Sequence, residues 1–213
     1  MIPLKLGVVG HLLCLGAHAD DIEIGAGGTL LRLLSENPTL MVTWVVFSAS
    51  GLRADEAQAS AAAYLAGAAE RRVVVKEFRD GYFPWDGAAI KDVFEQLKAL
   101  PAPDLSLTHE GGDRHQDHQV ISELTWNTFR DHLILEYEIP KWDGGLGAPN
   151  VFVPLDEAVR LRKVELLMTH FATQRAKRWF TPDTFHGLMR LRGVECHAPS
   201  GHAEAFHCRK ACL

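Results

Sequence analysis

The sequence predicts a layered α/β domain of Rossmann-like organisation, with a mostly parallel sheet and helices on both faces. Three observations support this fold class. Apolar runs of strand length alternate with helical patterns, the runs are apolar throughout rather than at every second position, and no repeat or Ser/Gly-rich linker interrupts the order. We expect one domain over residues 1–213, because a chain of this length buries roughly 70% of the surface exposed by its unfolded form.

Five apolar runs are expected to form strands, and they cover residues 11–17, 41–48, 72–78, 104–109 and 133–139. Helical patterns lie between and after them, over residues 27–37, 54–69, 88–100 and 117–130. In the third pattern, Ile90, Val93 and Leu97 share one face, which is the spacing of an amphipathic helix. After about residue 140 the sequence predicts a loop, then a helix over residues 156–174. The short polar tail that follows is expected to pack over the site edge of the sheet.

The composition indicates an ordinary soluble globular protein, with 47% hydrophobic and 23% charged residues. A formal charge of −5 does not favour a nucleic-acid partner. Four cysteines are too few for a disulfide framework, and we find no signal-peptide pattern and no apolar run of membrane-spanning length. We therefore expect a cytoplasmic protein without membrane insertion, and the sequence leaves open whether it forms a homo-oligomer.

Two clusters of metal-binding and proton-transferring side chains follow the first and fourth expected strands. They are His18, Asp20 and Asp21, and then His115, Asp117 and His118. The carboxyl ends of parallel strands meet at one edge of a sheet, so the clusters should lie together. Catalytic zinc commonly takes three His or carboxylate ligands and keeps a position for water. Either cluster alone could be a helix cap or a turn, but the two together predict metal-assisted hydrolysis.

The stretches "GAHADDIEIGAGGTL" and "DRHQDHQV" together resemble the PIG-L/LmbE family of zinc-dependent N-acetylglucosaminyl de-N-acetylases. The family signature is Ala-His-Pro-Asp-Asp-x-x-x-Gly followed later by His-x-Asp-His. The resemblance continues through "GLRADEAQASAAAYL", "RDGYF", "FATQR" and "RGVEC…GHAEAFH", so it covers nearly the whole chain. One departure is Ala19, which stands at the usual proline position. Because that proline would stiffen the turn without binding the metal, we expect activity to survive its replacement.

The resemblance implies a role for each residue of the two clusters. The metal ligands would be His18, Asp21 and His118. Asp20 would be the general base that activates water at the metal, and His115 the general acid or the positive group that steadies the oxyanion. Asp117 would orient His115. The implied reaction is attack of the activated water on an N-acetyl carbonyl, followed by release of acetate and a free amine.

The resemblance also implies a substrate and a cofactor. The substrate would be a small conjugate of an N-acetylglucosamine-type amino sugar, namely a glycoside, a nucleotide sugar or a glycolipid-like acceptor. Arg53, Arg114 and Asp80 lie near the motifs and are candidates to bind it. The expected cofactor is Zn²⁺, although His and Asp ligands accept other divalent metals.

Three alternatives remain from the sequence. The same fold and metal could serve a different amide conjugate, chosen by the aromatic residues of the loops over residues 79–85 and 140–150. The glycines of "GAGG" raise the possibility of a dinucleotide-binding module, but the acidic turn at residues 18–21 fills the place of the phosphate-binding glycines. The tail "CHAPSGHAEAFHCRKAC" contains enough Cys and His for a non-catalytic zinc site, without a paired Cys-x-x-Cys spacing.

Overall fold

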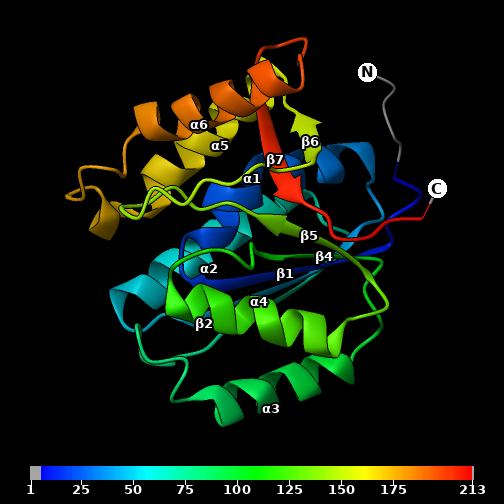
Figure 1. The fold of residues 1–213 in the computed structure, drawn as a ribbon, viewed down its shortest axis with the longest axis vertical. Coiled ribbons are helices and arrows are strands. Elements are labelled where there is room, and N and C mark those ends of the chain that lie inside the picture. Colours follow the sequence, from blue (N-terminus) through cyan, green and yellow to red (C-terminus); the bar gives the residue numbers. More distant parts are fainter. Residues whose placement is uncertain (1–5, 213) are drawn as a thin grey trace.

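The computed structural model describes residues 6–212 and shows a seven-stranded sheet in the order β3-β2-β1-β4-β5-β7-β6 with helices on both faces (Figure 1). The five strands β1 to β5 pair in parallel. The strand β7 runs antiparallel to β5 and to β6. The predicted fold class, a mostly parallel α/β sheet, is confirmed.

The bounds of the elements follow the predicted order closely in the first two thirds of the chain. The strands are β1 His11–His18, β2 Met41–Ser48, β3 Glu70–Val75, β4 Leu105–His109, β5 Leu133–Tyr137, β6 Val151–Pro154 and β7 Ala203–His207. The helices are α1 Asp21–Glu36, α2 Leu52–Tyr64, α3 Gly87–Lys98, α4 Gln116–Thr128, α5 Glu157–His170 and α6 Pro182–Glu195. Two short 3-10 helices, η1 Leu65–Gly67 and η2 Ala172–Gln174, complete the set.

The last third of the chain differs from the prediction. The segment expected to be a polar tail forms α6 and β7, and the stretch between the expected loop and the helix over residues 156–174 forms β6, so three elements extend the fold beyond the predicted ones. The strand β7 has a weak sequence signal because it is only five residues long and contains the charged Glu204, whose side chain is nonetheless buried. In α6 the apolar pattern is broken by polar residues, and its buried side chains include only Phe185 and Met189 as large apolar groups.

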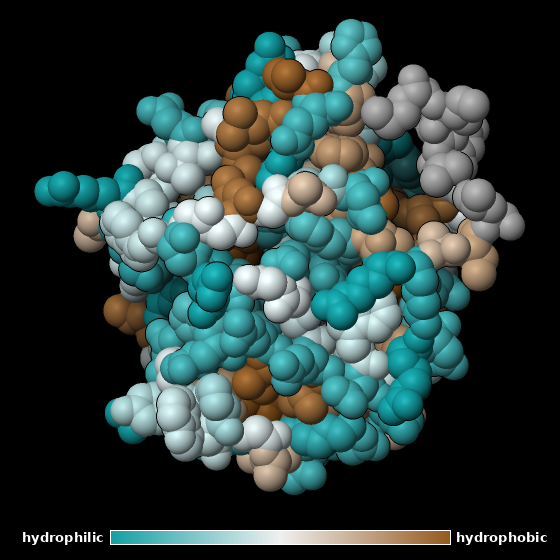
Figure 2. Space-filling view, viewed as in Figure 1, coloured by the Kyte–Doolittle hydropathy of each residue, from teal (hydrophilic) through white to brown (hydrophobic). Residues whose placement is uncertain are grey.

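Two hydrophobic cores lie on the two faces of the sheet. One contains side chains of α1, α2, α5 and α6, and the other contains side chains of α3 and α4. In Figure 1 the helices α3 and α4 lie below the sheet, and α5 and α6 lie above it. Apolar side chains also reach the outer surface of α6, where Leu191 and Val194 are exposed, and Figure 2 shows hydrophobic surface over this helix. None of the helices in residues 6–212 has the length and apolar character needed to cross a bilayer.

Glycines let α1 approach the sheet closely. A Cβ added at Gly25 would lie 2.1 Å from the ring of Tyr137 in β5, and one at Gly28 would lie 2.5 Å from Leu155. The Tyr137 hydroxyl donates a hydrogen bond to the carbonyl oxygen of Leu15 at 2.7 Å, which fixes the ring under the helix. This packing shows that the glycines let the helix approach its neighbours closely.

A buried ion pair ties the late elements to α1. The Lys163 ammonium of α5 lies 2.6 Å from the Glu204 carboxylate of β7, and it also donates to the carbonyl oxygen of Ile24. Glu204 accepts hydrogen bonds from the backbone N–H groups of Gly28 and Thr29 at 2.8 and 2.6 Å. Every charge in this cluster therefore has a partner, as burial requires.

Candidate active site

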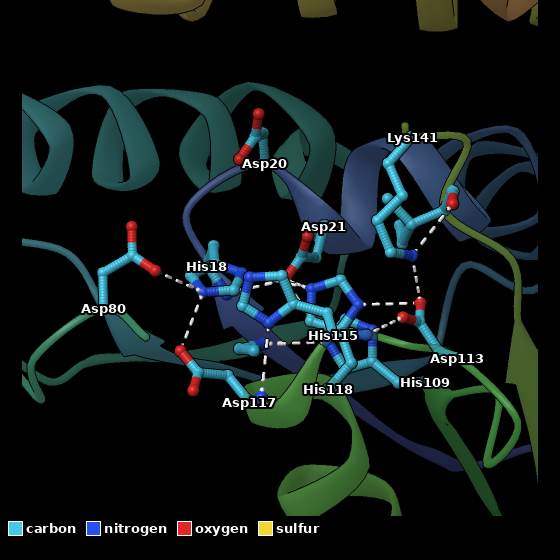
Figure 3. Close-up of polar contacts among 12 residues, drawn as sticks. His18, Asp20, Asp21, Asp80, His109, Asp113, His115, Asp117, His118 and Lys141 are labelled. Atoms are coloured by element: carbon cyan, nitrogen blue, oxygen red, sulfur yellow. Dashed lines mark hydrogen bonds and ion pairs between the residues drawn. The ribbon is translucent and has the colours of Figure 1, made fainter. Parts of the chain in front are cut away.

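The two predicted clusters meet at the carboxyl edge of the sheet. The strands β1 and β4 are neighbours and parallel, so the turn after β1 and the loop after β4 leave the sheet side by side. His18 is the last residue of β1, and Asp21 opens α1. His115 caps the N-terminus of α4, and His118 lies in its first turn. Figure 3 shows these side chains converging from the two segments.

Three donor atoms form a compact triangle. The Nδ1 atom of His18 lies 3.2 Å from Oδ2 of Asp21 and 3.2 Å from Nε2 of His118, and the last two atoms are 3.5 Å apart. A tetrahedral zinc site with bonds of about 2.0–2.2 Å separates its ligand atoms by roughly 3.3–3.6 Å. His18, Asp21 and His118 thus fit a metal with three protein ligands, and they are the three residues predicted for that role.

The charged groups in and around the triangle determine which of its three side chains carries a proton. Burial alone would lower the pKa of His18, but the Asp21 carboxylate and the neighbouring carboxylates raise it well above its usual value. Burial and the nearby His109 lower the pKa of His118 to about 3, so this ring is neutral. The pKa of Asp21 is held well below its usual range by His118, His109 and His18, against the effect of its burial. Before a metal binds, the triangle therefore carries one proton that the metal must displace.

Asp113 supports His118 and was not singled out in the sequence. Its Oδ2 lies 2.8 Å from Nδ1 of His118, and its Oδ1 accepts the backbone N–H of His115 at 2.7 Å. Lys141, in the loop after β5, forms an ion pair with the same carboxylate. An acceptor on Nδ1 places the lone pair of His118 on Nε2, which faces the triangle. The available signal was the position of Asp113 in "DRHQDH", two residues before the motif histidine.

His109 is a second residue that sequence reasoning missed. This last residue of β4 is fully buried, and its ring stacks on that of His118 at 3.9 Å between centroids. Its Nε2 lies 3.3 Å from Oδ2 of Asp21, so geometry alone would allow His109 to join Asp21 and His118 around a metal. That nitrogen also accepts the backbone N–H of Ala17 at 2.9 Å, which occupies its lone pair. His109 therefore packs against the ring of His118 next to the triangle and is not one of its donor residues.

Asp20 stands beside the triangle and is paired with Arg53. It occupies the N-cap position of α1 but makes no capping hydrogen bond with its side chain. Instead its Oδ1 accepts a hydrogen bond from Nη2 of Arg53 at 2.7 Å. The interpretation of Asp20 as a simple helix cap is thereby excluded. Arg53, predicted to bind substrate, uses its guanidinium first to hold this carboxylate.

Asp117 differs from the prediction that it orients His115. Its carboxylate accepts the backbone N–H groups of Gly81 and Phe83, at 2.7 and 3.1 Å, and lies 3.2 Å from Nε2 of His18. The two residues are joined instead through the backbone, because the N–H of Asp117 donates to Nδ1 of His115. The reason is the direction of the side chain, which points from the first turn of α4 toward the loop over residues 79–83 (Figure 3).

The remaining predicted residues lie at different depths. The Asp80 carboxylate, with its side chain 75% exposed, reaches Nε2 of His18 at 3.1 Å. Burial and the proximity of His18 lower the pKa of His115, so its ring is neutral near pH 7. Arg114 is exposed, and it makes no ion pair within residues 6–212. Asp80 and His115 thus belong to the site, whereas Arg114 stays a predicted substrate contact.

Comparison with known proteins identifies the family. The sequence profile of the family described as "PIG-L: GlcNAc-PI de-N-acetylase" matches residues 13–129, which is more than half of the chain. The chain belongs to the PIG-L family. The match includes both clusters of the candidate active site, so the resemblance read from the two motifs is confirmed.

Solved structures share the fold of this PIG-L protein. The conserved protein TT1542 from Thermus thermophilus is 19% identical with a TM-score of 0.73, and 97% of each chain is covered. The N,N'-diacetylchitobiose deacetylase from Pyrococcus horikoshii is 17% identical with a TM-score of 0.69, over 94% of this chain and 84% of that one. The 4-carboxy-2-hydroxymuconate hydratase GalB from Pseudomonas putida KT2440 is 16% identical with a TM-score of 0.70, over 95% and 97%. The fold alone therefore does not fix the reaction.

The Cys and His residues of the tail do not form a second metal cluster within residues 6–212. The three groups of side chains in this range that could hold a metal all lie in the candidate active site. Cys196 and Cys208 are free and partly buried, and Cys212 is free and exposed. This arrangement removes the support for a zinc site in the tail.

Proposed function

We propose that the protein is a zinc-dependent deacetylase that removes the N-acetyl group from an N-acetylglucosamine-type amino sugar in a small conjugate. The observation that supports this proposal is the triangle of His18 Nδ1, Asp21 Oδ2 and His118 Nε2, with Asp20 beside it. Membership of the PIG-L family supports the N-acetyl group as the target. A cytoplasmic location and the possibility of a homo-oligomer stay predictions.

His18, Asp21 and His118 would hold the metal. A bound zinc ion would polarise the acetyl carbonyl and lower the pKa of a water molecule. Asp20 accepts a proton from the attacking water, and its ion pair with Arg53 holds the carboxylate in place beside the triangle. The protonated Asp20 carboxyl can then supply the proton that the departing amine nitrogen requires.

His115 would stabilise the developing oxyanion as a neutral donor. Its lowered pKa makes the uncharged ring the dominant form near pH 7. Because Nδ1 accepts the backbone N–H of Asp117, the ring proton resides on Nε2. A hydrogen bond from this N–H to the carbonyl oxygen strengthens as negative charge develops there, which lowers the activation barrier.

The substrate would enter beside the loop over residues 79–85. Asp80 carries an exposed carboxylate at the rim of the site, which suits a sugar hydroxyl. Tyr82 and Trp85 on the same loop are 41% and 72% exposed, and aromatic faces of this kind stack on sugar rings. A different amide conjugate remains the alternative substrate, because the same contacts would serve another group attached to the acyl nitrogen.

Acetate release from a panel of N-acetylglucosamine derivatives tests the proposal directly. The purified protein is assayed with each derivative as loaded, after chelation, and after chelation followed by added zinc. We expect release from at least one derivative, loss with the chelator and recovery with zinc. Zinc bound tightly without acetate release from any derivative would contradict the amino-sugar substrate, and N-acylated amino acids and thiol conjugates would then be assayed.

A further inference from the structure

The carboxylate of Asp113 joins three parts of the candidate active site. Its Oδ2 lies 2.8 Å from Nδ1 of His118, and its Oδ1 accepts the backbone N–H of His115 at 2.7 Å. The Lys141 ammonium forms an ion pair with Oδ2. One side chain therefore contacts a residue of the triangle, the residue that would donate to the oxyanion, and a segment that follows a different strand.

The loop that carries Asp113 needs an anchor outside itself. It follows β4 and contains two adjacent glycines, Gly111 and Gly112, whose backbone can adopt many conformations. The Asp113 side chain is buried, so an orientation without partners would leave a charge unpaired. Lys141 supplies the anchor from the segment after β5, the parallel neighbour of β4. Its ammonium also donates to the carbonyl oxygen of Ile139 at 3.2 Å, which limits where the lysine can lie.

Lys141 lies behind the ring of His118, away from the metal triangle. The Nδ1 atom of His118 faces Asp113, whereas Nε2 faces His18 and Asp21. Figure 3 shows Asp113 and Lys141 on the side of the site away from His18. With its ammonium paired to Asp113 and its side chain only 14% exposed, the lysine acts on the site through this carboxylate.

We propose that Lys141 is a positioning residue, which holds the Asp113 carboxylate so that His118 and His115 keep their places in the site. Partners of this kind orient metal-binding histidines in proteins. A positive charge near a metal site also acts at a distance, because it repels the ion. The two effects differ in sign when the lysine is removed. Loss of orientation weakens zinc binding, whereas loss of repulsion strengthens it.

Zinc affinity of the full-length protein, measured by competition with a chromophoric chelator, separates the two effects. Asp113→Asn should weaken zinc binding by about 10- to 100-fold, and Lys141→Met by roughly 3- to 10-fold. The double variant should bind zinc no more weakly than Asp113→Asn alone, because the lysine acts through the carboxylate. Lys141→Arg should restore part of the affinity. Lys91→Met, which removes a lysine from an exposed pair with Glu95, is the matched control and should bind zinc as the wild type does.

Amide hydrogen exchange of the metal-free protein gives a readout that needs neither zinc nor a substrate. Lys141→Met should speed exchange over residues 110–115, which include the His115 N–H bound by Asp113. Exchange in the central strands β1 and β2 should stay as in the wild type. Faster exchange throughout the chain would show a merely structural role and overturn the proposal.

The effect of Lys141 on turnover rests on the proposed deacetylase function, and the two can fail separately. Unchanged or tighter zinc binding in Lys141→Met, or additive losses in the double variant, would overturn the positioning role even if the protein proved to be a deacetylase. A wild type without zinc affinity would overturn the proposed function, and local exchange would still decide the role of Lys141. Where acetate release is found, Lys141→Met at full zinc occupancy should lower kcat by roughly 3- to 10-fold with KM unchanged.

Discussion

The Nη2 atom of Arg53 donates to Oδ1 of Asp20 over 2.7 Å and joins α2 to the N-terminal turn of α1. Arg53 is itself fixed, because its guanidinium lies 3.5 Å from Glu56 and 3.5 Å from the hydroxyl of Thr173. Thr173 in turn donates its backbone N–H and its hydroxyl to Glu56. The general base of the proposed reaction is therefore held by a network that reaches from α2 to η2.

Arg53→Ala should lower kcat by about 10- to 100-fold while leaving the zinc content unchanged. The estimate corresponds to about 1.5–3 kcal/mol for a hydrogen bond to a charged group. Arg53→Lys should restore part of the rate, because an ammonium can replace the single hydrogen bond from Nη2 to Asp20. Arg162→Ala, at an exposed site of α5, serves as the control. A variant with normal kcat and a raised KM would show that Arg53 acts on the substrate alone.

Asp20→Asn and His118→Ala should fail in different ways. Asp20→Asn loses the proton acceptor and should lower kcat by about 10²–10⁴-fold at full metal occupancy. His118→Ala removes one of the three donor side chains, so this variant should no longer bind the metal. Zinc content by atomic emission and acetate release, measured on the same samples, separate the two effects. His132→Ala, outside the triangle, should match the wild type in both. Full activity in Asp20→Asn would show that another group is the base.

Zinc affinity should rise as the pH rises above the usual histidine pKa of about 6.5. The sign follows from His18, whose raised pKa means that the metal-free triangle holds a proton near neutral pH. Metal binding must expel this proton, so acid opposes binding. His118, with its pKa lowered to about 3, adds no second proton in this range. Competition titrations at several pH values should give a slope of about one decade per pH unit. A pH-independent affinity would contradict the protonation of His18.

Asp117→Ala should release the loop over residues 79–83 from α4. The change leaves the buried backbone N–H group of Phe83 and the partly buried one of Gly81 without their acceptor, at a cost of about 1–3 kcal/mol each where water cannot replace it. We expect faster amide hydrogen exchange in this loop and a raised KM. Asp92→Ala on the outer part of α3 is a control for the loss of a carboxylate. Unchanged exchange in the loop would rule out the anchoring role.

Lys163→Met should lower the free energy of unfolding by about 3–5 kcal/mol, because it leaves Glu204 buried without its counter-charge. The double variant with Glu204→Leu removes both charges and should be no less stable than the single one. Arg162→Met, one residue away in an exposed pair with Glu165, should change stability by less than about 0.5 kcal/mol. Denaturant unfolding of the four proteins measures these differences. Equal stability of Lys163→Met and the wild type would refute the role of the pair.

The sequence predicted the parts of the fold and site where a chemical motif follows a clear strand or helix pattern. That His18, Asp21 and His118 lie together could be predicted because parallel-strand topology brings both clusters to one edge, whereas their role as metal ligands came from the family resemblance and stays a prediction. The contacts of the Asp117 side chain could not be predicted, since the direction of this side chain depends on where the loop over residues 79–83 packs. Lys141 lies 28 residues along the chain from Asp113, and His109 lies far from Asp21, so no local pattern marks their contacts. The strand β7 escaped prediction because its burial depends on a partner for Glu204 that only the folded chain supplies.

The loop over residues 79–85 combines a backbone that Asp117 holds in place with side chains that are free to vary. Its backbone is fixed to the residues that surround His18, whereas the side chains of Tyr82 and Trp85 project into solvent. Substitutions at these two positions can therefore change the surface presented to an incoming molecule without moving the groups that carry out the reaction. A library confined to positions 82 and 85 would vary ligand preference on a constant catalytic frame.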